Sequence, residues 1–311
     1  MGLDSQEKLR LDANPIPAAT IRNLSAQERR ALRKAQPSPR GPSVYKTEDL
    51  SIASQVGDVP IRVYYPDEIG PFPALVWFHG GGWIQGDIDT FDGTARQLCV
   101  VSQNVVISVD YRLSPESKFP DAVEDCYTAI QWTVQNAASI NVDPQLVSVG
   151  GDSAGGNLAA VMSLMARDKG GPDLACQVLV YPVTDHNFTT RSYITNGNGY
   201  GLTKDDMVFY WNQYLKNETD AKNPYAAPAQ ADDLRNLPPA LVITAEYDPL
   251  CDEGYEYSER LKQSGVSTLY RRYDGVAHGF LGAWSMVDKA LHAINCVGAT
   301  LKKLAAGEHI E

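Results

Sequence analysis

The sequence is poor in cysteine and lacks long apolar runs. Only 5 of the 311 residues are cysteine, an odd number, and no two of them form a C-x-x-C pair. This spacing predicts neither a zinc site nor a disulfide framework, so we expect reduced, mostly buried thiols and no metal or other cofactor. No apolar stretch approaches the roughly 18–20 residues that a membrane-spanning helix requires, so we expect no membrane partner.

Targeting signals and basic clusters are also scarce. The first residues, MGLDSQEKLRLDANP, lack a basic end followed by an apolar segment, which argues against a secretory signal. The formal net charge is −11, and an acidic protein repels a phosphate backbone, so we expect no nucleic-acid partner. The densest basic stretch, residues 28–34 (ERRALRK), predicts the solvated face of a helix. Together these features predict a soluble, cytoplasmic protein.

The composition is otherwise ordinary for a globular protein, with 43% hydrophobic and 21% charged residues. From about residue 50, short apolar segments alternate with segments of helical length and periodicity. The expected strands are 50–54, 59–65, 74–78, 105–109, 146–149, 176–181, 240–244 and 268–273, and the expected helices are 122–136, 156–167, 253–263 and 283–304. This alternation predicts an α/β fold with a mainly parallel sheet and helices on both faces.

Two segments depart from this alternation. Residues 1–45 are polar and contain five prolines, with one helix-like stretch in which Ser25 and Glu28 form a capping box. The region between the strands ending near 181 and beginning near 240 has no strong strand but includes a predicted helix at 203–215. We therefore expect an N-terminal arm (1–45) and a cap insertion (185–225) over a catalytic core formed by 46–184 and 226–311.

The strongest chemical signal is the pentapeptide Gly151-Asp152-Ser153-Ala154-Gly155, a G-x-S-x-G pattern. It lies between a predicted strand and a predicted helix, the context in which this pattern forms a nucleophile elbow. The tight turn needs small neighbours and pushes the serine out at the carboxyl edge of the sheet. We expect Ser153 to be a nucleophile and Asp152 to anchor the elbow.

The second signal is the HGGGW sequence at 79–83, directly after the strand predicted at 74–78. Three consecutive glycines are costly in conformational entropy unless their backbone is needed. Acyl transfer creates an oxyanion that backbone N–H groups stabilise. We expect Gly81, Gly82 and Ala154 to donate to it, and Gly80 to shape the turn; the alternative is a plain glycine turn.

A serine nucleophile needs a histidine base, and three histidines follow it at a useful distance from the C-terminus. His186 precedes any plausible acid and falls in the insertion, while His292 lies inside a long predicted helix. His278 lies in the loop GVAHGF after the last predicted strand, from which a side chain can reach across the sheet edge. We therefore expect His278 to be the base.

The base in turn needs an orienting acid, which in this architecture lies between the serine and the histidine in sequence. Asp248 follows a predicted strand and stands 30 residues before the histidine. Asp252 is the rival, although it fits better as a helix cap. Glu246, on the strand itself, is the third choice.

Five motifs in the same order give the chain a family resemblance. They are HGGGW (79–83), DYRLSPE (110–116), GDSAGG (151–156), DPLCDEG (248–254) and HGF (278–280). The chain resembles the hormone-sensitive-lipase-like carboxylesterases, which implies an α/β-hydrolase fold with a two-part cap and esters of short to medium acyl chains as substrates. The resemblance also implies that His79 holds the oxyanion loop in place and that Arg112 and Glu116 are structural.

The same resemblance aligns Ser153, Asp248 and His278 with the family triad, and Gly81 and Gly82 with its oxyanion donors. The resulting hypothesis is a metal-independent serine carboxylesterase that acts on a small ester and water through an acyl-enzyme. An amidase or deacetylase with the same triad is the alternative. A ligand receptor on a hydrolase scaffold is disfavoured, because all three triad candidates are present.

Aromatic residues near these motifs predict an apolar substrate pocket. Trp83 lies beside the oxyanion loop, and the helix predicted at 203–215 carries four more aromatics, Phe209, Tyr210, Trp211 and Tyr214. The alternative is that this helix simply buries its aromatic face on the core. The sequence also leaves open a homodimer formed through the last strand or helix.

Overall fold

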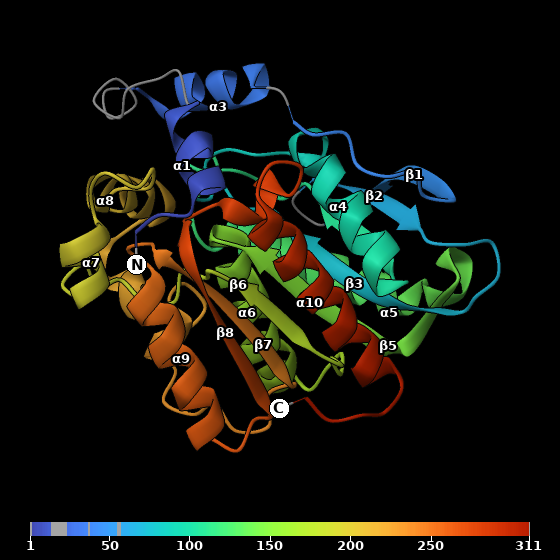
Figure 1. The fold of residues 1–311 in the computed structure, drawn as a ribbon. Coiled ribbons are helices and arrows are strands. Elements are labelled where there is room, and N and C mark those ends of the chain that lie inside the picture. Colours follow the sequence, from blue (N-terminus) through green and yellow to red (C-terminus); the bar gives the residue numbers. More distant parts are fainter. Residues whose placement is uncertain (1, 14–23, 37, 55–56, 311) are drawn as a thin grey trace.

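The computed structural model describes residues 2–13, 24–36, 38–54 and 57–310. These residues form a single sheet of eight strands. The strand order is β1-β2-β4-β3-β5-β6-β7-β8 (Figure 1). β2 pairs antiparallel with β1 and β4, and the other neighbours pair parallel. The bounds are β1 (Lys46–Ile52), β2 (Val59–Tyr65), β3 (Phe72–Phe78), β4 (Val105–Val109), β5 (Val142–Asp152), β6 (Gln177–Val180), β7 (Ala240–Tyr247) and β8 (Thr268–Ala277). The predicted mainly parallel sheet is confirmed.

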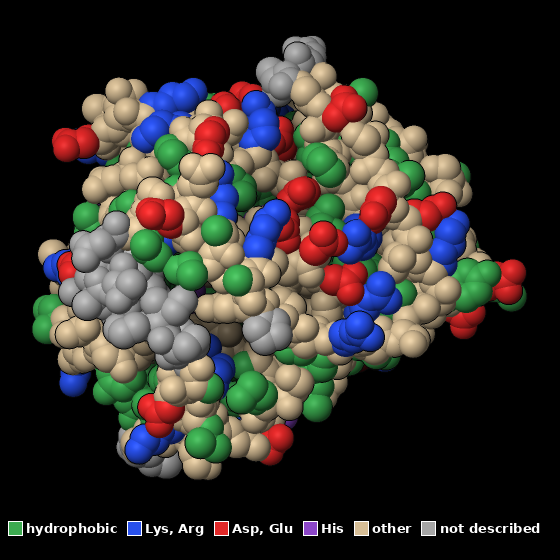
Figure 2. Space-filling view, turned by 90° about the horizontal axis from the view of Figure 1, so that it is seen from above, with side chains coloured by type: hydrophobic (Ala, Val, Ile, Leu, Met, Phe, Trp, Pro, Cys, Tyr) green, Lys and Arg blue, Asp and Glu red, His purple; other side chains and the backbone are tan. Residues whose placement is uncertain are grey.

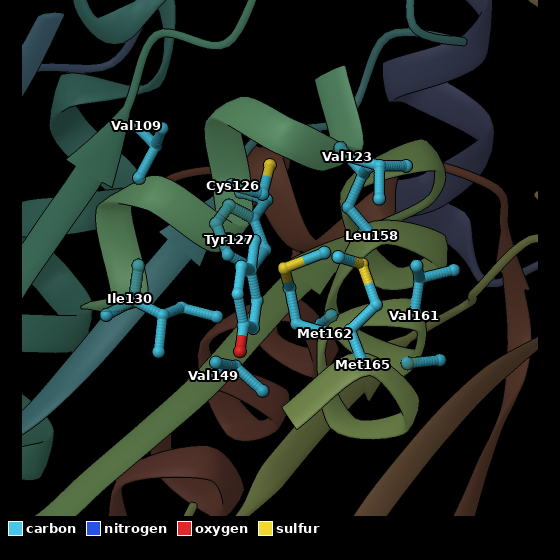
Figure 3. Close-up of a cluster of buried hydrophobic side chains, with 14 of the residues drawn as sticks. Val109, Val123, Cys126, Tyr127, Ile130, Val149, Leu158, Val161, Met162 and Met165 are labelled. Carbon is cyan, nitrogen blue, oxygen red and sulfur yellow. The ribbon is translucent and has the colours of Figure 1, made fainter. Parts of the chain in front are cut away.

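Helices cover both faces of the sheet because alternate strand residues point to opposite sides. In β3, Val76 and Phe78 belong to the apolar cluster with α5 (Asp121–Gln135), α6 (Ala154–Lys169) and α9 (Cys251–Gln263). Leu75 and Trp77 belong to the cluster on the other face, with α4 (Ile88–Ser102) and α10 (Asp288–Ala305). Figure 3 shows part of the first cluster, where side chains of α5 and α6 meet those of the central strands. The α/β-hydrolase fold expected from the sequence is confirmed.

The helix α4 was not predicted, and its composition explains why. Its sequence, IDTFDGTARQLCVVS, begins with residues of low helix propensity and contains Gly93 in its interior. The helix is stabilised by an N-terminal capping box between Asp87 and Thr90. A side chain at Gly93 would overlap the backbone carbonyl of Pro39, so the glycine lets the N-terminal segment approach closely.

Four further helices lie together above the carboxyl ends of the parallel strands (Figure 1): α1 (Ser5–Asp12), α3 (Ala26–Ala35), α7 (Arg191–Asn196) and α8 (Lys204–Tyr214). α3 and its Ser25–Glu28 capping box were predicted, whereas α1 and α7 were not. Residues 1, 14–23 and 37 of the expected arm lie outside the described residues. The remaining short helices are η1 (Ala137–Ile140), η2 (Glu218–Lys222), η3 (Pro228–Gln230) and η4 (Phe280–Ala283).

The prediction that residues 28–34 form a solvated face is wrong for part of α3. Arg29 is buried, and its guanidinium lies 3.0 Å from the carboxylate of Asp206 in α8. Arg30 pairs with Glu116 at 2.6 Å. These ion pairs join α3 to α8 and to the loop after β4, and thereby hold α3 over the sheet edge. No described helix is long and apolar enough to cross a membrane.

Candidate active site

Ser153 stands at the turn between β5 and α6, in a backbone conformation that is rare outside glycine. Its φ is +58° and its ψ is −118°. The turn is so tight that a side chain at Gly155 would overlap the carbonyl of Phe78, and one at Gly151 would overlap the backbone of Gly155. Strain of this kind persists only where the surrounding structure holds it, and it projects the serine hydroxyl from the edge of the sheet.

A hydrogen-bonded chain joins this serine to a histidine and an aspartate from two other strand ends. His278 Nε2 lies 2.9 Å from Ser153 Oγ, and His278 Nδ1 lies 2.7 Å from Asp248 Oδ2. The Asp248 carboxylate is fully buried, and its second oxygen accepts the Leu250 N–H at 2.9 Å. An ionised carboxylate only accepts hydrogen bonds, so the imidazole carries its proton on Nδ1 and accepts the serine hydroxyl at Nε2.

The rival histidines contact neither Ser153 nor Asp248. His186 lies edge-on to Trp211, with ring centroids 5.1 Å apart, and burial lowers the pKa of its imidazole. His292 Nδ1 lies 3.0 Å from the hydroxyl of Tyr273. Both contacts fit packing roles.

The rival acids likewise bind elsewhere. The Asp252 carboxylate accepts the backbone N–H of Ser192 at 2.7 Å, so it fixes the start of α7 rather than capping its own helix. Glu246 accepts the backbone N–H of Gly275 at 2.7 Å. Of the three candidate acids, Asp248 is the one bonded to His278.

The glycine loop after β3 faces the same cavity as the serine. Gly81 and Gly82 have φ values of +124° and +61°, and both line the cavity with Ser153. A side chain at Gly82 would overlap the ring of Tyr210. Ala154 is the first residue of α6, where a backbone N–H has no partner within the helix. These placements suit an oxyanion site formed by the three predicted N–H donors.

Buried contacts hold this loop in place. The Gly80 N–H donates to Asp152 Oδ1 at 3.1 Å, which ties the loop to the nucleophile elbow. Burial raises the pKa of Asp152 to about 6, against the opposing effect of that N–H. Burial lowers the pKa of His79 to about 4, so its neutral imidazole donates from Nδ1 to the Gly80 carbonyl at 2.8 Å.

One supporting residue was missed at the sequence level. The Tyr111 hydroxyl donates to the His79 carbonyl at 2.7 Å, and the two rings stack with centroids 4.4 Å apart. Tyr111 belongs to the DYRLSPE motif, in which the family resemblance predicts roles only for Arg112 and Glu116. In the structure Arg112 grips the buried Asp125 carboxylate, with a shortest distance of 2.8 Å.

A cavity of about 300 Å³ opens onto Ser153, and its lining corrects part of the predicted pocket. Tyr210 lines it, whereas Trp83, Phe209 and Trp211 do not. Trp83 and Trp211 are fully buried, with ring centroids 4.8 Å apart. Trp83 has a positive φ of +58°, and its side chain belongs to the buried apolar cluster rather than to the cavity lining.

The remaining predicted aromatics are also occupied elsewhere. The Phe209 ring packs under the Arg29 guanidinium at 4.2 Å, and the Tyr214 ring stacks on Trp83 at 4.2 Å. The alternative reading of this helix, burial of an aromatic face on the core, therefore describes most of α8. Tyr210 differs because it lies over Gly82.

The N-terminal helix α1 contacts the histidine loop directly. The fully buried Glu7 carboxylate accepts the Ala277 N–H at 2.8 Å and binds Arg10 through two hydrogen bonds of 2.6 and 2.8 Å. Arg10 also donates to the His278 carbonyl at 3.1 Å. The backbone on both sides of the 277–278 peptide bond is thus fixed by residues more than 260 positions away in the sequence.

We expect Glu7→Ala to weaken both stability and catalysis. The change leaves Arg10 without its carboxylate and the Ala277 N–H without an acceptor, which should cost about 2–4 kcal/mol in the free energy of unfolding. It should also lower kcat, because His278 loses the support of its backbone. Denaturant unfolding and ester turnover measure the two effects. Glu7→Gln keeps an acceptor for the amide and should lose less of both; equal losses in the two variants would contradict this role.

The fold and the serine–histidine–aspartate chain at its carboxyl edge define the class of α/β hydrolases. A sequence model of a family described as alpha/beta hydrolase fold matches residues 75–282. The chain belongs to this family of hydrolases, and its relatives confirm the resemblance to the hormone-sensitive-lipase-like carboxylesterases.

Three similar proteins illustrate the relationship. A carboxylic ester hydrolase of Mycobacterium tuberculosis, LipN, is 42% identical over 83% of this chain and 69% of its own. An arylesterase of Saccharolobus solfataricus is 43% identical over 80% of this chain and 81% of its own. The structure of a hyperthermophilic esterase from the archaeon Pyrobaculum calidifontis has a TM-score of 0.90 and 39% identity, and it covers 98% of this chain and 99% of its own.

Proposed function

We propose that this protein is a serine carboxylesterase that hydrolyses carboxylic esters through an acyl-enzyme. The hydrogen-bonded chain from Ser153 through His278 to the buried Asp248, opening onto a cavity faced by the glycine loop, is the observation that carries the proposal. Relatives named carboxylic ester hydrolase and arylesterase support the same reaction class.

In the first half of the reaction, His278 Nε2 takes the proton of the Ser153 hydroxyl as Oγ bonds to the ester carbonyl carbon. The carbonyl oxygen becomes an oxyanion, which receives hydrogen bonds from the N–H groups of Gly81, Gly82 and Ala154. His278 then gives its proton to the leaving alcohol as the carbon–oxygen bond breaks. Asp248 keeps the imidazole in the required tautomer and stabilises its charged form.

In the second half, water takes the place of the alcohol. His278 accepts a proton from the water as the water oxygen attacks the acyl carbon. His278 then returns a proton to Ser153 Oγ as the carboxylic acid leaves. The N–H groups of the glycine loop again stabilise the oxyanion, so one preorganised site serves both steps.

The size of the cavity favours small substrates. At about 300 Å³ it lies at the lower end of the volumes found for ligand pockets, which suits esters of short to medium acyl chains. Residues 1–45 and 185–225 would form the cap over the catalytic core of 46–184 and 226–311. Contacts of α3 and α8 with each other and with the cavity support this division.

Turnover of matched p-nitrophenyl esters of increasing acyl length, together with the corresponding p-nitroanilides, tests the proposal. We expect kcat/KM to be highest for short to medium acyl chains and the esters to be hydrolysed far faster than the anilides, because an amine is the poorer leaving group. Anilide turnover equal to or above that of the ester would favour an amidase or deacetylase. Absence of turnover on every ester would contradict the proposal. A cytoplasmic location and a homodimer stay predictions from the sequence.

A further inference from the structure

Among the described residues, one arginine that lines the active-site cavity has no carboxylate within ion-pair distance. Arg33, on α3, lines the cavity together with Ser153, and also lines three neighbouring cavities. Within the described chain, its closest polar contact is the Gln36 side-chain oxygen at 3.4 Å, and its guanidinium lies 5.5 Å from the centre of the Phe91 ring. No described carboxylate oxygen lies within 4.0 Å of it, the separation that defines the ion pairs of this structure.

The other basic residues of α3 are all paired. Arg29 binds Asp206, Arg30 binds Glu116, and Lys34 binds Asp87 at 3.0 Å. Arg10, the other arginine that lines the cavity, is held by the Glu7 carboxylate. Within the described chain, Arg33 therefore differs from its neighbours in lining the cavity in front of Ser153 with a guanidinium that no carboxylate pairs.

A half-buried cation without a partner is energetically costly. Burial lowers the pKa of the Arg33 guanidinium, but an arginine side chain keeps its charge in proteins because the guanidinium delocalises it. A guanidinium presents a planar fork of N–H donors that matches the two oxygens of a carboxylate. An anionic group of a bound molecule would thus supply the missing partner.

We propose that Arg33 binds a carboxylate carried by the substrate, so that the enzyme prefers monoanionic esters such as the half-esters of short dicarboxylic acids. The inference rests on the proposed function, because the same cavity must hold the ester carbonyl at Ser153 and the carboxylate at Arg33. A cavity of about 300 Å³ holds both groups only if a short chain joins them.

Asp152 offers an alternative role for Arg33, as a counter-charge within the protein. The Asp152 carboxylate also lines the cavity and attracts the Arg33 guanidinium, but one Asp152 oxygen already accepts the Gly80 N–H. If balancing Asp152 were the whole role, replacing Arg33 would affect neutral and anionic esters alike. Selective loss of the anionic substrate therefore separates the two roles.

The surrounding surface does not attract anions in general. The formal net charge of the chain is −11, and on the face shown in Figure 2 acidic and basic side chains are intermixed. A preference for an anionic ester would thus depend on the local contact with Arg33, and should respond to the replacement of that residue more than to a change of surface charge.

The test compares kcat/KM for two matched pairs of esters by pH-stat titration of the purified full chain. Monoethyl glutarate and ethyl pentanoate differ by a carboxylate on the acyl part; 4-acetoxybenzoate and 4-tolyl acetate differ by a carboxylate on the alcohol part. In Arg33→Gln we expect kcat/KM for the anionic member of one pair to fall about 10- to 100-fold, mainly through KM, with its neutral partner changed less than about 3-fold. Arg33→Lys should retain an intermediate preference.

Lys34→Gln is the matched control, because it removes the same charge from an exposed position of the same helix. It should change neither member of either pair. Equal losses on neutral and anionic esters in Arg33→Gln, or no loss on either anionic ester, would overturn the proposal while leaving the esterase function intact. If the wild-type protein hydrolyses none of the four esters, the proposed function itself fails.

Discussion

Ser153→Ala is expected to lower kcat for ester hydrolysis by about 10⁴- to 10⁶-fold, since under the proposed mechanism it removes the atom that forms the acyl-enzyme. The residual rate would come from the oxyanion donors and from substrate binding, which stay in place. The Ser153 side chain is small and sits on the surface of the cavity, so its loss should leave the free energy of unfolding nearly unchanged. Stopped assays with p-nitrophenyl butyrate and a denaturant titration measure the two quantities.

Ser163→Ala provides the matched control for this loss. Ser163 is buried on the same helix α6, and its hydroxyl donates only to the Ala159 carbonyl one turn earlier. The variant should retain wild-type kcat within about 3-fold. The lost hydrogen bond should change only the free energy of unfolding, by about 1 kcal/mol. Normal hydrolysis by Ser153→Ala, or an equal loss in Ser163→Ala, would contradict the assignment of the nucleophile.

Asp248→Asn should lower kcat by about 10³- to 10⁴-fold while changing KM little. In the native site, one Asp248 oxygen accepts from Leu250 N–H and the other from His278 Nδ1. An asparagine would keep its oxygen on the Leu250 N–H and turn its NH₂ group toward the imidazole. That arrangement makes Nδ1 the acceptor and places the ring proton on Nε2. A protonated Nε2 can no longer take the proton of the Ser153 hydroxyl.

Asp252→Asn is the matched comparison, with the same chemical change four residues further along the chain. Its carboxylate contacts the Ser192 N–H rather than His278, so kcat should stay within about 5-fold of wild type. A larger loss in Asp252→Asn than in Asp248→Asn would show that the acid has been assigned to the wrong residue.

The parts of the site that could be predicted are those encoded by local chain geometry. A nucleophile elbow needs small residues next to the serine, and here they lie within the five-residue pattern 151–155. An oxyanion loop needs consecutive glycines directly after a strand. Both patterns are visible in a short window of sequence. The order of serine, acid and histidine, with each candidate placed after a strand, predicts Asp248 and His278 over their rivals, and the structure joins these two to Ser153 by hydrogen bonds.

The contacts that could not be predicted depend on how distant segments pack. Helix α1 is short and polar, and its buried Glu7 carboxylate binds the backbone N–H of the residue before His278. Apolar periodicity gives no sign of such a contact. The same holds for α3, whose basic sequence predicts a solvated face. In the structure Arg29 pairs with Asp206 of α8 and Arg33 lines the cavity, and both placements depend on packing against distant segments.

The predicted pocket failed in part for a related reason. Closeness in sequence to the oxyanion loop made Trp83 a candidate, but its ring is fully buried against Trp211 and Tyr214 of α8, contacts that depend on the packing of a distant segment. On α8, the helical repeat places Trp211 and Tyr214 against the core and Tyr210 over Gly82. Which of these aromatics would face the substrate depended on how the helix is rotated on the core.

Covalent labelling tests the central claim, that Ser153 is an activated nucleophile, more directly than any rate. The protein would be treated with a fluorophosphonate and digested, and its peptides analysed by mass spectrometry in parallel with activity. We predict one adduct per chain, on Ser153, formed in step with the loss of ester hydrolysis and absent from Ser153→Ala. An adduct on another residue, or full activity in a protein labelled at Ser153, would contradict the account.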